Sequence, residues 1–178
     1  MASPPKVKSC VVSCFLLLLF LGFFRFACVA LARAPDLGQD PSVVTRTGLV
    51  HEVGEKVSRV QTWLKEQGLA GVLLTQVRNF SWITAGLGRS DVVLTSEVGS
   101  ASLLITSDAR KYLVAASDEV PRLMDEDLKD LGFEVRDFKW YEDKTRPDRK
   151  LAIIHDLTQG QPVGTDVPYG DLKLVDIG

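Results

Sequence analysis

The sequence is poor in the residues that most often bind metals or form cross-links. Its 178 residues include only three cysteines, all within residues 1–32, and two histidines, His51 and His155. A disulfide framework and a thiolate metal site are therefore excluded for residues 33–178. Neither histidine belongs to an H-E-x-x-H or H-x-x-E spacing, so we interpret both as surface or packing residues.

An excess of charge of one sign is also lacking. The chain has 21 basic and 23 acidic residues, and residues 1–32 hold three basic residues and no acidic one. The remainder therefore has 18 basic and 23 acidic residues, or a net charge of −5. This mixed, mildly acidic composition argues against the basic stripe of a protein that binds nucleic acid or anionic membranes.

The first 32 residues follow the three-part plan of a secretory signal peptide. Two lysines precede an apolar run from Cys10 to Phe24, and the segment ends in the small-residue pattern of Ala30-Leu31-Ala32. We expect cleavage between Ala32 and Arg33. The mature protein would then be secreted or periplasmic, having entered the secretory pathway.

A signal anchor is the alternative for the same segment. Residues 10–32 are long enough to span a bilayer, and Arg25 lies near the far end of the run, where its charge costs less than at mid-membrane. In that case the protein would stay membrane-anchored by residues 10–32.

Residues 33–50 are predicted to be a linker. They contain two prolines and two glycines and show no sustained apolar period. The remainder, residues 51–178, is long enough to fold as one domain with a packed core and no disulfide.

The apolar run at residues 70–75 is the centre of the predicted fold. Gly68 before it is typical of a helix end, and the run is continuously apolar, as in a strand buried on both faces. Leu73 and Leu74 would then point to opposite faces of a sheet. A helix that leads into such a strand indicates an α/β layer fold.

The remaining elements are predicted from periodicity and turn residues. Helices are expected from about Glu52 to Gln67, from Ser117 to Gly132, and from the charged loop at 142–150 to about Leu157. Further strands are expected at 91–95, 101–106, 111–115, 133–138, 162–165 and 172–176, with a hairpin turn at 107–110.

The order of these segments resembles the creatinase N-terminal domain, which precedes the catalytic half of Xaa-Pro aminopeptidases, prolidases and creatinases. In that family an apolar strand leads to an Asn-apolar-x-aromatic-apolar-Thr-Gly segment, and residues 79–86 here read NFSWITAG. The resemblance covers roughly residues 50–178 and includes segments 101–106, 111–114, 119–122 and 140–143. It implies a three-layer α/β fold, ribonuclease H-like, with a mixed sheet of about six strands and helices on both faces.

The resemblance implies a non-catalytic role. The family's catalytic half, a metal-dependent aminopeptidase or dipeptidase, binds two divalent ions (manganese, cobalt or zinc) through aspartate, histidine and glutamate ligands that cannot be placed here. We therefore expect neither a metal nor a cofactor in this chain and no hydrolase activity by itself.

Two functional interpretations stay open at this point. In the first, the chain is a fragment of an exported peptidase and serves subunit assembly and the shape of the substrate entrance. In the second, it is a standalone α/β binding or assembly module without peptidase activity. The expected partner is a second copy or a full-length family relative, and a peptide substrate would be met only through the missing catalytic half.

By resemblance, four residues are candidates for an interface or for the edge of a substrate site: Asn79, Trp82, Arg122 and Trp140. Core or edge packing is the alternative for the two tryptophans. Asn79 also begins the glycosylation sequon Asn-Phe-Ser and is the only asparagine in the chain. Its position after a buried strand, between aromatic residues, argues against access for a glycan.

Two other motifs have structural interpretations. The acidic residues 125–127 and Asp130 would point in different directions from a helix, so they would not converge on a metal. Residues 86–90 (GLGRS) lack the lysine of a P-loop and the third glycine of a Rossmann motif, and we interpret them as a turn.

Amino-terminal sequencing of the exported protein is expected to begin at Arg33, because the small residues before it fit a signal-peptidase site. A product that retains Met1 and remains with the membrane fraction would instead support the signal anchor.

Overall fold

The computed structural model describes residues 45–93, 95–142 and 148–177. The signal peptide or anchor, the cleavage site at Ala32 and Arg33, and most of the expected linker lie outside these residues. In the part that is described, no helix is long and apolar enough to cross a membrane.

The elements in chain order are α2 (Arg46–Gln67), β1 (Gly71–Gln76), α3 (Val77–Ile83), β2 (Val98–Thr106), β3 (Lys111–Ala116), α4 (Val120–Arg122), the π-helix η1 (Leu123–Asp127), β4 (Glu134–Phe138), α5 (Arg149–Thr158), β5 (Val163–Thr165) and β6 (Lys173–Leu174).

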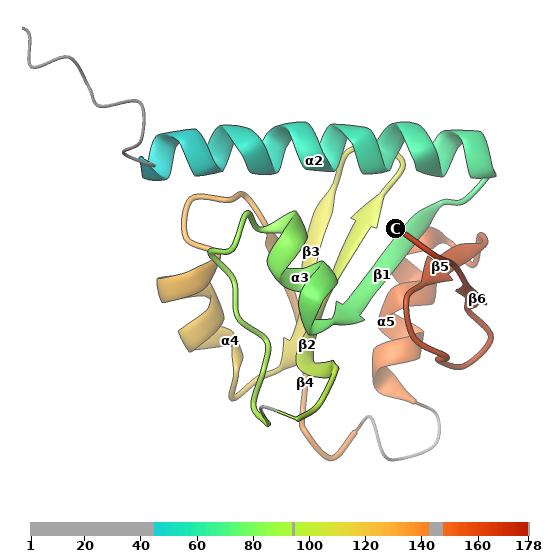
Figure 1. Ribbon diagram of the computed structural model, residues 1–178. Helices are drawn as coiled ribbons and strands as arrows, with labels where there is room; N and C mark the ends of the chain where they lie inside the picture. Colours follow the sequence, from blue (N-terminus) through green and yellow to red (C-terminus); the bar gives the residue numbers. More distant parts are fainter. Residues whose placement is uncertain (1–44, 94, 143–147, 178) are drawn as a thin grey trace, which may run out of the picture. The chain divides into compact units, whose positions relative to one another are not determined.

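A six-stranded mixed sheet in the order β4-β3-β2-β1-β5-β6 forms the middle layer (Figure 1). Only β2 is antiparallel to its neighbours, and the other pairs are parallel. The carboxyl ends of β1, β3, β4 and β5 therefore lie on the same side of the sheet, along the line where these strands end. We call this line of strand ends the carboxyl edge. In open α/β sheets, ligands most often bind outside the carboxyl ends of the strands.

Strand β1 is buried on both faces. Leu73 and Leu74 are both fully buried but belong to different apolar clusters. Leu74 packs in the cluster formed with α2, α3 and η1, whereas Leu73 packs in the cluster that contains residues of α5. Figure 1 accordingly shows α3 in front of the sheet and α5 behind it. The predicted three-layer α/β fold with helices on both faces is confirmed.

Helix α2 begins earlier than its apolar pattern predicts. The side chain of Thr45 accepts a hydrogen bond from the backbone N–H of Gly48 at 3.2 Å and so caps the helix at its start. Residues 46–50, expected as the end of a linker, are therefore helical. The helix ends as predicted at Gly68, whose φ of 65° is the left-handed conformation that glycine adopts readily.

The prediction of a strand at 91–95 is wrong. The described residues of this range form bends and turns, and Val92 and Val93 are exposed, so their apolar side chains do not mark a buried strand. The next strand, β2, begins at Val98, which pairs with Gln76 of β1. This is three residues before the predicted start of the strand at 101–106.

The helix predicted from Ser117 to Gly132 is present but shorter and less regular, because helical residues extend only from Val120 to Asp127. The Ser117 hydroxyl donates to the Asp137 carboxylate at 2.7 Å instead of capping a helix, and one α-helical turn passes into η1. The N–H of Leu128 reaches the carbonyl of Leu123 at 2.7 Å, a five-residue spacing that leaves both leucines fully buried. A five-residue turn that buries both side chains thus replaces a regular α-helical turn.

The second half of the fold follows the prediction more closely. The strands β3 and β4, the helix α5 and the strands β5 and β6 all lie within the predicted ranges or one residue from them, and β2 ends at Thr106 as predicted. The last strand, β6, is shorter than expected and has only two residues.

Truncation of either central leucine to alanine (Leu73→Ala or Leu74→Ala) is expected to lower the free energy of unfolding by about 2–5 kcal/mol, the usual cost for a buried leucine. Urea denaturation would measure both variants beside Leu174→Ala, which removes an exposed leucine and should change stability by less than about 0.5 kcal/mol. One large and one negligible loss would contradict a sheet covered on both faces.

Candidate interaction site at the carboxyl edge of the sheet

A buried carboxylate joins three elements at the carboxyl edge. Asp166 follows β5 directly and is only 6% exposed. Its two carboxylate oxygens accept hydrogen bonds from the backbone N–H of Thr75 at 2.8 Å, the backbone N–H of Gln76 at 2.9 Å and the Nδ2 of Asn79 at 2.9 Å. The Gln76 side chain in turn donates to the Asp166 carbonyl at 2.7 Å. These bonds fix β5, the end of β1 and the start of α3 to one another.

A second group of polar side chains extends this network toward α5. The hydroxyls of Thr75 and Ser102 lie 2.8 Å apart, and the Lys150 Nζ donates to the Ser102 hydroxyl at 2.8 Å. The Tyr169 hydroxyl donates to the Asp148 carboxylate at 2.6 Å, while the Lys150 Nζ lies 4.9 Å from the centre of the Tyr169 ring. Because these groups bind one another, the network stabilises the fold at this edge.

Asn79 takes part in this network. Its side chain is half-buried, and the Nδ2 that a glycan would modify is the atom that donates to Asp166. Glycosylation would therefore require the loss of this hydrogen bond. Asp166, which the sequence analysis missed, could have been suspected because it follows a strand whose carboxyl end meets that of β1.

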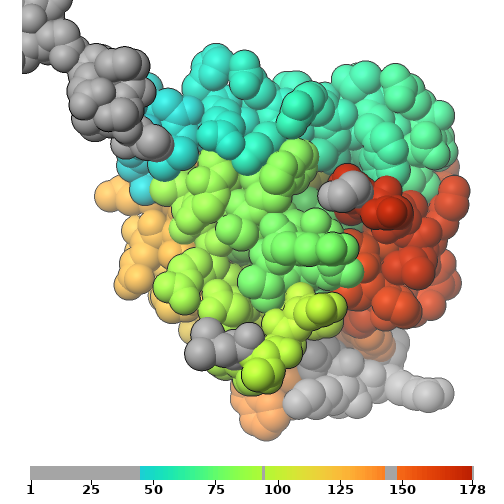
Figure 2. Space-filling model, in the orientation of Figure 1, coloured from blue at the N-terminus to red at the C-terminus, as the bar shows by residue number. Residues whose placement is uncertain are grey.

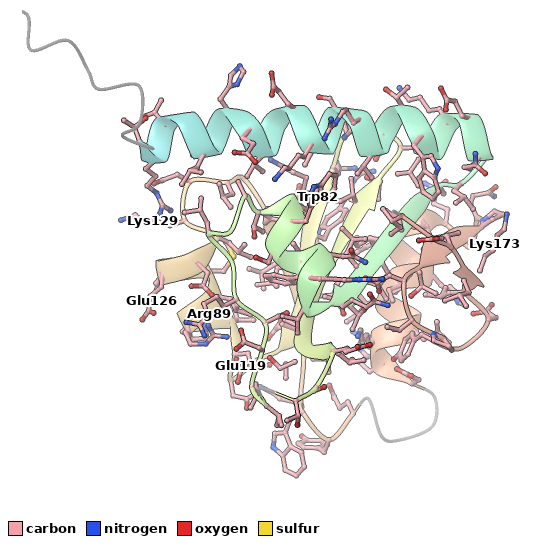
Figure 3. The ribbon with its side chains drawn as sticks, in the orientation of Figure 1. Trp82, Arg89, Glu119, Glu126, Lys129 and Lys173 are labelled. Carbon is pink, nitrogen blue, oxygen red and sulfur yellow. The ribbon has the colours of Figure 1, made fainter. Side chains whose placement is uncertain are left out.

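Trp82 lies on α3 but faces α2, away from the carboxyl edge (Figure 3). The residue is 40% exposed, and its backbone carbonyl accepts a hydrogen bond from the Lys56 Nζ at 2.7 Å. The Lys56 Nζ lies 5.2 Å from the ring centre and the Arg59 Cζ lies 5.9 Å from it, which are cation–π distances. Trp82 is thus partly exposed between two cations of α2.

Arg122 binds within the domain. Its guanidinium donates to Glu119 at 3.1 Å, to Asp127 at 3.0 Å and to the carbonyl of Arg89 at 3.2 Å. Burial alone would lower the pKa of Arg122, but Glu119 and Asp127 outweigh this effect and raise the pKa above its ordinary value. Since Asp127 also accepts from the backbone N–H of Arg89, these residues connect α4 and η1 to the segment after α3.

Trp140 follows β4 and is exposed at the carboxyl edge. The residue is 61% exposed, and its ring packs edge-to-face against that of Tyr141, which is 51% exposed, with the ring centres 5.6 Å apart. Of the alternative considered for Trp140, core or edge packing, the core position is therefore wrong, whereas the contact with Tyr141 is compatible with edge packing.

More exposed apolar side chains belong to the same edge. Val98 begins β2 opposite the end of β1, and the exposed Val92 and Val93 precede it. Figure 2 shows this yellow-green segment next to the orange turn after β4 at the lower end of the view. We call Val92, Val93, Val98, Trp140 and Tyr141 the edge surface.

The four candidates from the sequence thus do not form one site. Asn79 and Arg122 are bound to other side chains of the domain, whereas Trp82 and Trp140 expose apolar rings on two different surfaces. The edge surface combines two aromatic rings and three valines, a composition that favours contact with another protein.

The other motifs behave as structural residues. Over the described ranges, no group of three or more histidine, cysteine, aspartate or glutamate side chains could hold a metal. His51 is exposed on α2, 3.8 Å from Glu55, and His155 lies 3.1 Å from Asp171. Of the glycine-rich segment 86–90, interpreted as a turn, only Gly86 belongs to a turn and the rest is irregular; a Cβ on Gly88 would come within 2.7 Å of the Phe80 ring.

The substitution Asp166→Asn is expected to lower the free energy of unfolding by about 1–3 kcal/mol, because its amide NH₂ would face N–H donors that now have an acceptor. Urea denaturation would compare it with Asp171→Asn, an exposed residue beside His155, for which we expect a change below about 0.5 kcal/mol. Equal effects of the two substitutions would show that the buried carboxylate does not hold the edge together.

Comparison with known proteins gives structural matches alone. No protein-family model matches the sequence, and a search of curated proteins gives no significant match. Among solved structures, the dipeptidase PepE from Mycobacterium ulcerans is similar with a TM-score of 0.49 and 15% identity, over 67% of this chain and 30% of that one. A Xaa-Pro aminopeptidase from Streptococcus pyogenes is similar with a TM-score of 0.43 and 16% identity, over 65% of this chain and 74% of that one.

A third similar structure was solved as a domain by itself. It is the N-terminal domain of a Xaa-Pro dipeptidase from Lactobacillus brevis, with a TM-score of 0.45 and 17% identity, over 66% of this chain and 93% of that one. The chain therefore spans most of this isolated domain but less than a third of the PepE dipeptidase. The structural match is one of fold, to the creatinase/prolidase N-terminal domain.

Proposed function

We propose that this chain is the non-catalytic N-terminal domain of an exported Xaa-Pro aminopeptidase- or prolidase-like metallopeptidase, and that it serves subunit assembly and shapes the entrance to the substrate site. The order of its sequence segments supports the relationship, and the leader at residues 1–32 supports export. The observation that carries the assembly role is the edge surface.

The edge surface has the chemistry of a contact between proteins. Tryptophan and tyrosine supply large apolar areas with one polar atom each, and they are enriched at the centres of protein interfaces. The polar side chains of the same edge, such as Asp166 and Lys150, form hydrogen bonds within the domain. An approaching protein would therefore meet exposed apolar side chains and would not need to break this network.

The position of this surface also suits a role at a substrate entrance. Loops at the carboxyl edge of a sheet can be changed without loss of the fold, because the strands hold their ends in place. Trp140 and Tyr141 follow β4 in such a loop and stand outside the core. A loop of this kind could border the substrate path of a neighbouring subunit, whose catalytic half would supply the two divalent ions.

The experiment is sedimentation equilibrium of the full chain over a range of concentrations. We expect concentration-dependent self-association, and we expect the double substitution Trp140→Ser with Tyr141→Ser to weaken it about tenfold or more, as for residues at the centre of an interface. Leu174→Ser is the matched control, because it removes an exposed apolar side chain at β6, the other end of the sheet order.

The proposal would be contradicted in either of two ways. A chain that is monomeric at every concentration would exclude assembly through its own copies. Self-association that the double substitution leaves unchanged, or that Leu174→Ser weakens equally, would show that the edge surface is not the contact.

A further inference from the structure

A second exposed surface lies between α2 and the end of α3, away from the carboxyl edge. It is a groove of about 220 Å³ lined by Arg59, Val60, Trp63, Trp82 and Ile177. We call it the α2–α3 groove. Small-molecule sites usually measure about 300–1,000 Å³, so this groove is better suited to a single side chain than to a whole ligand.

The lining of the groove is apolar and firmly held. Val60 is buried in the core, and Trp63 and Ile177 pack against the same cluster. Trp82, which is 40% exposed, closes one side, and its ring lies within cation–π distance of the Lys56 Nζ and the Arg59 Cζ. A side chain that entered the groove would therefore meet two indole rings that already make contacts within the domain.

The two cations beside Trp82 differ in their partners. The Lys56 Nζ lies 2.6 Å from the Glu52 carboxylate and also binds the Trp82 carbonyl at 2.7 Å, so its charge is neutralised locally. Arg59 is exposed, and among the described residues it forms no ion pair with a carboxylate. A guanidinium that is stacked near an aromatic face and keeps its N–H donors available is well suited to bind a carboxylate.

We propose that the α2–α3 groove binds an acidic peptide segment. An apolar side chain of the peptide enters between Trp63 and Trp82, and a neighbouring aspartate or glutamate pairs with Arg59. The combination of tryptophan and arginine is typical of residues that dominate binding energy at protein interfaces. This site is separate from the edge surface, and its occupant differs from the second copy proposed there.

The experiment uses three dye-labelled synthetic nonapeptides and fluorescence anisotropy with the full chain. The first has a central leucine flanked by aspartates, the second replaces the aspartates by lysines, and the third replaces the leucine by glycine. We expect the first to bind most tightly, with affinity that falls as salt is added, because the carboxylate contact is exposed to solvent.

Substitutions in the groove identify the contact. Arg59→Ala is expected to weaken the aspartate peptide about two- to fivefold, the range for an exposed ion pair. Arg59→Glu should weaken it further and reverse the preference in favour of the lysine peptide, and Trp82→Ala should weaken both leucine peptides. The matched control is Arg149→Glu, which reverses the charge of an exposed arginine on α5, a helix of the opposite face.

Several results would overturn the proposal. These are a lack of binding by the aspartate peptide, equal binding of the aspartate and lysine peptides, or an unchanged preference in a folded Arg59→Glu variant. Circular dichroism of each variant establishes folding. If Arg59→Glu or Trp82→Ala changes the oligomeric state without peptide, the groove is a contact between copies and the peptide proposal is wrong.

Discussion

The fold depends on how the carboxylate of Asp166 is held at the carboxyl edge. A buried carboxylate is costly unless it is hydrogen-bonded, and here three N–H groups surround it. Two of these are backbone N–H groups at the point where β1 passes into α3 without a loop. The carboxylate thus stabilises both the parallel pairing of β5 with β1 and the sharp change of direction that begins α3.

The direction of α3 determines where the two exposed surfaces lie. From its start at the carboxyl edge the helix runs toward α2 and brings Trp82 under Lys56 and Arg59. The chain then has to return to the carboxyl edge before β2 can begin, and Arg122 holds part of this return through the carbonyl of Arg89. The α2–α3 groove therefore lies at the end of α3, next to α2. The edge surface lies at the opposite end, where the return segment reaches the carboxyl edge.

The sequence predicts those elements that local patterns determine. The unbroken apolar run at 70–75 predicted a strand with both faces covered, and the left-handed glycine at 68 marked the end of α2. The hairpin between β2 and β3 and the helix α5 were predicted for the same reason, because turn residues and a helical period mark them within a few residues of sequence.

The errors of prediction arise where distant residues replace a local signal. No local motif marks α3, because its start is fixed by distant acceptors. The backbone N–H of Gln76, the residue before the helix, donates to Asp166, 90 residues farther along the chain, and the N–H of Val77 donates to the carbonyl of Glu97. The periodic apolar positions after Ser117 fit a long helix, yet burial of Leu123 and Leu128 and the ion pair of Arg122 with Asp127 favour a five-residue turn. The 3.6-residue apolar period does not contain this burial or this ion pair, so it could not predict the five-residue turn.

The same distinction explains the outcome for the candidate site. Resemblance selected Asn79, Arg122 and two tryptophans together, but their surroundings differ in a way that a sequence pattern does not contain. Asn79 and Arg122 are each bound to carboxylates of the domain, so a partner that used them would first have to break those hydrogen bonds. Trp82 and Trp140 are 40% and 61% exposed, so each has apolar surface that contact with a partner would remove from water. Asn79 and Arg122 are therefore suited to hold the two surfaces in place, and the two tryptophans are suited to contact the partner that binds at each surface.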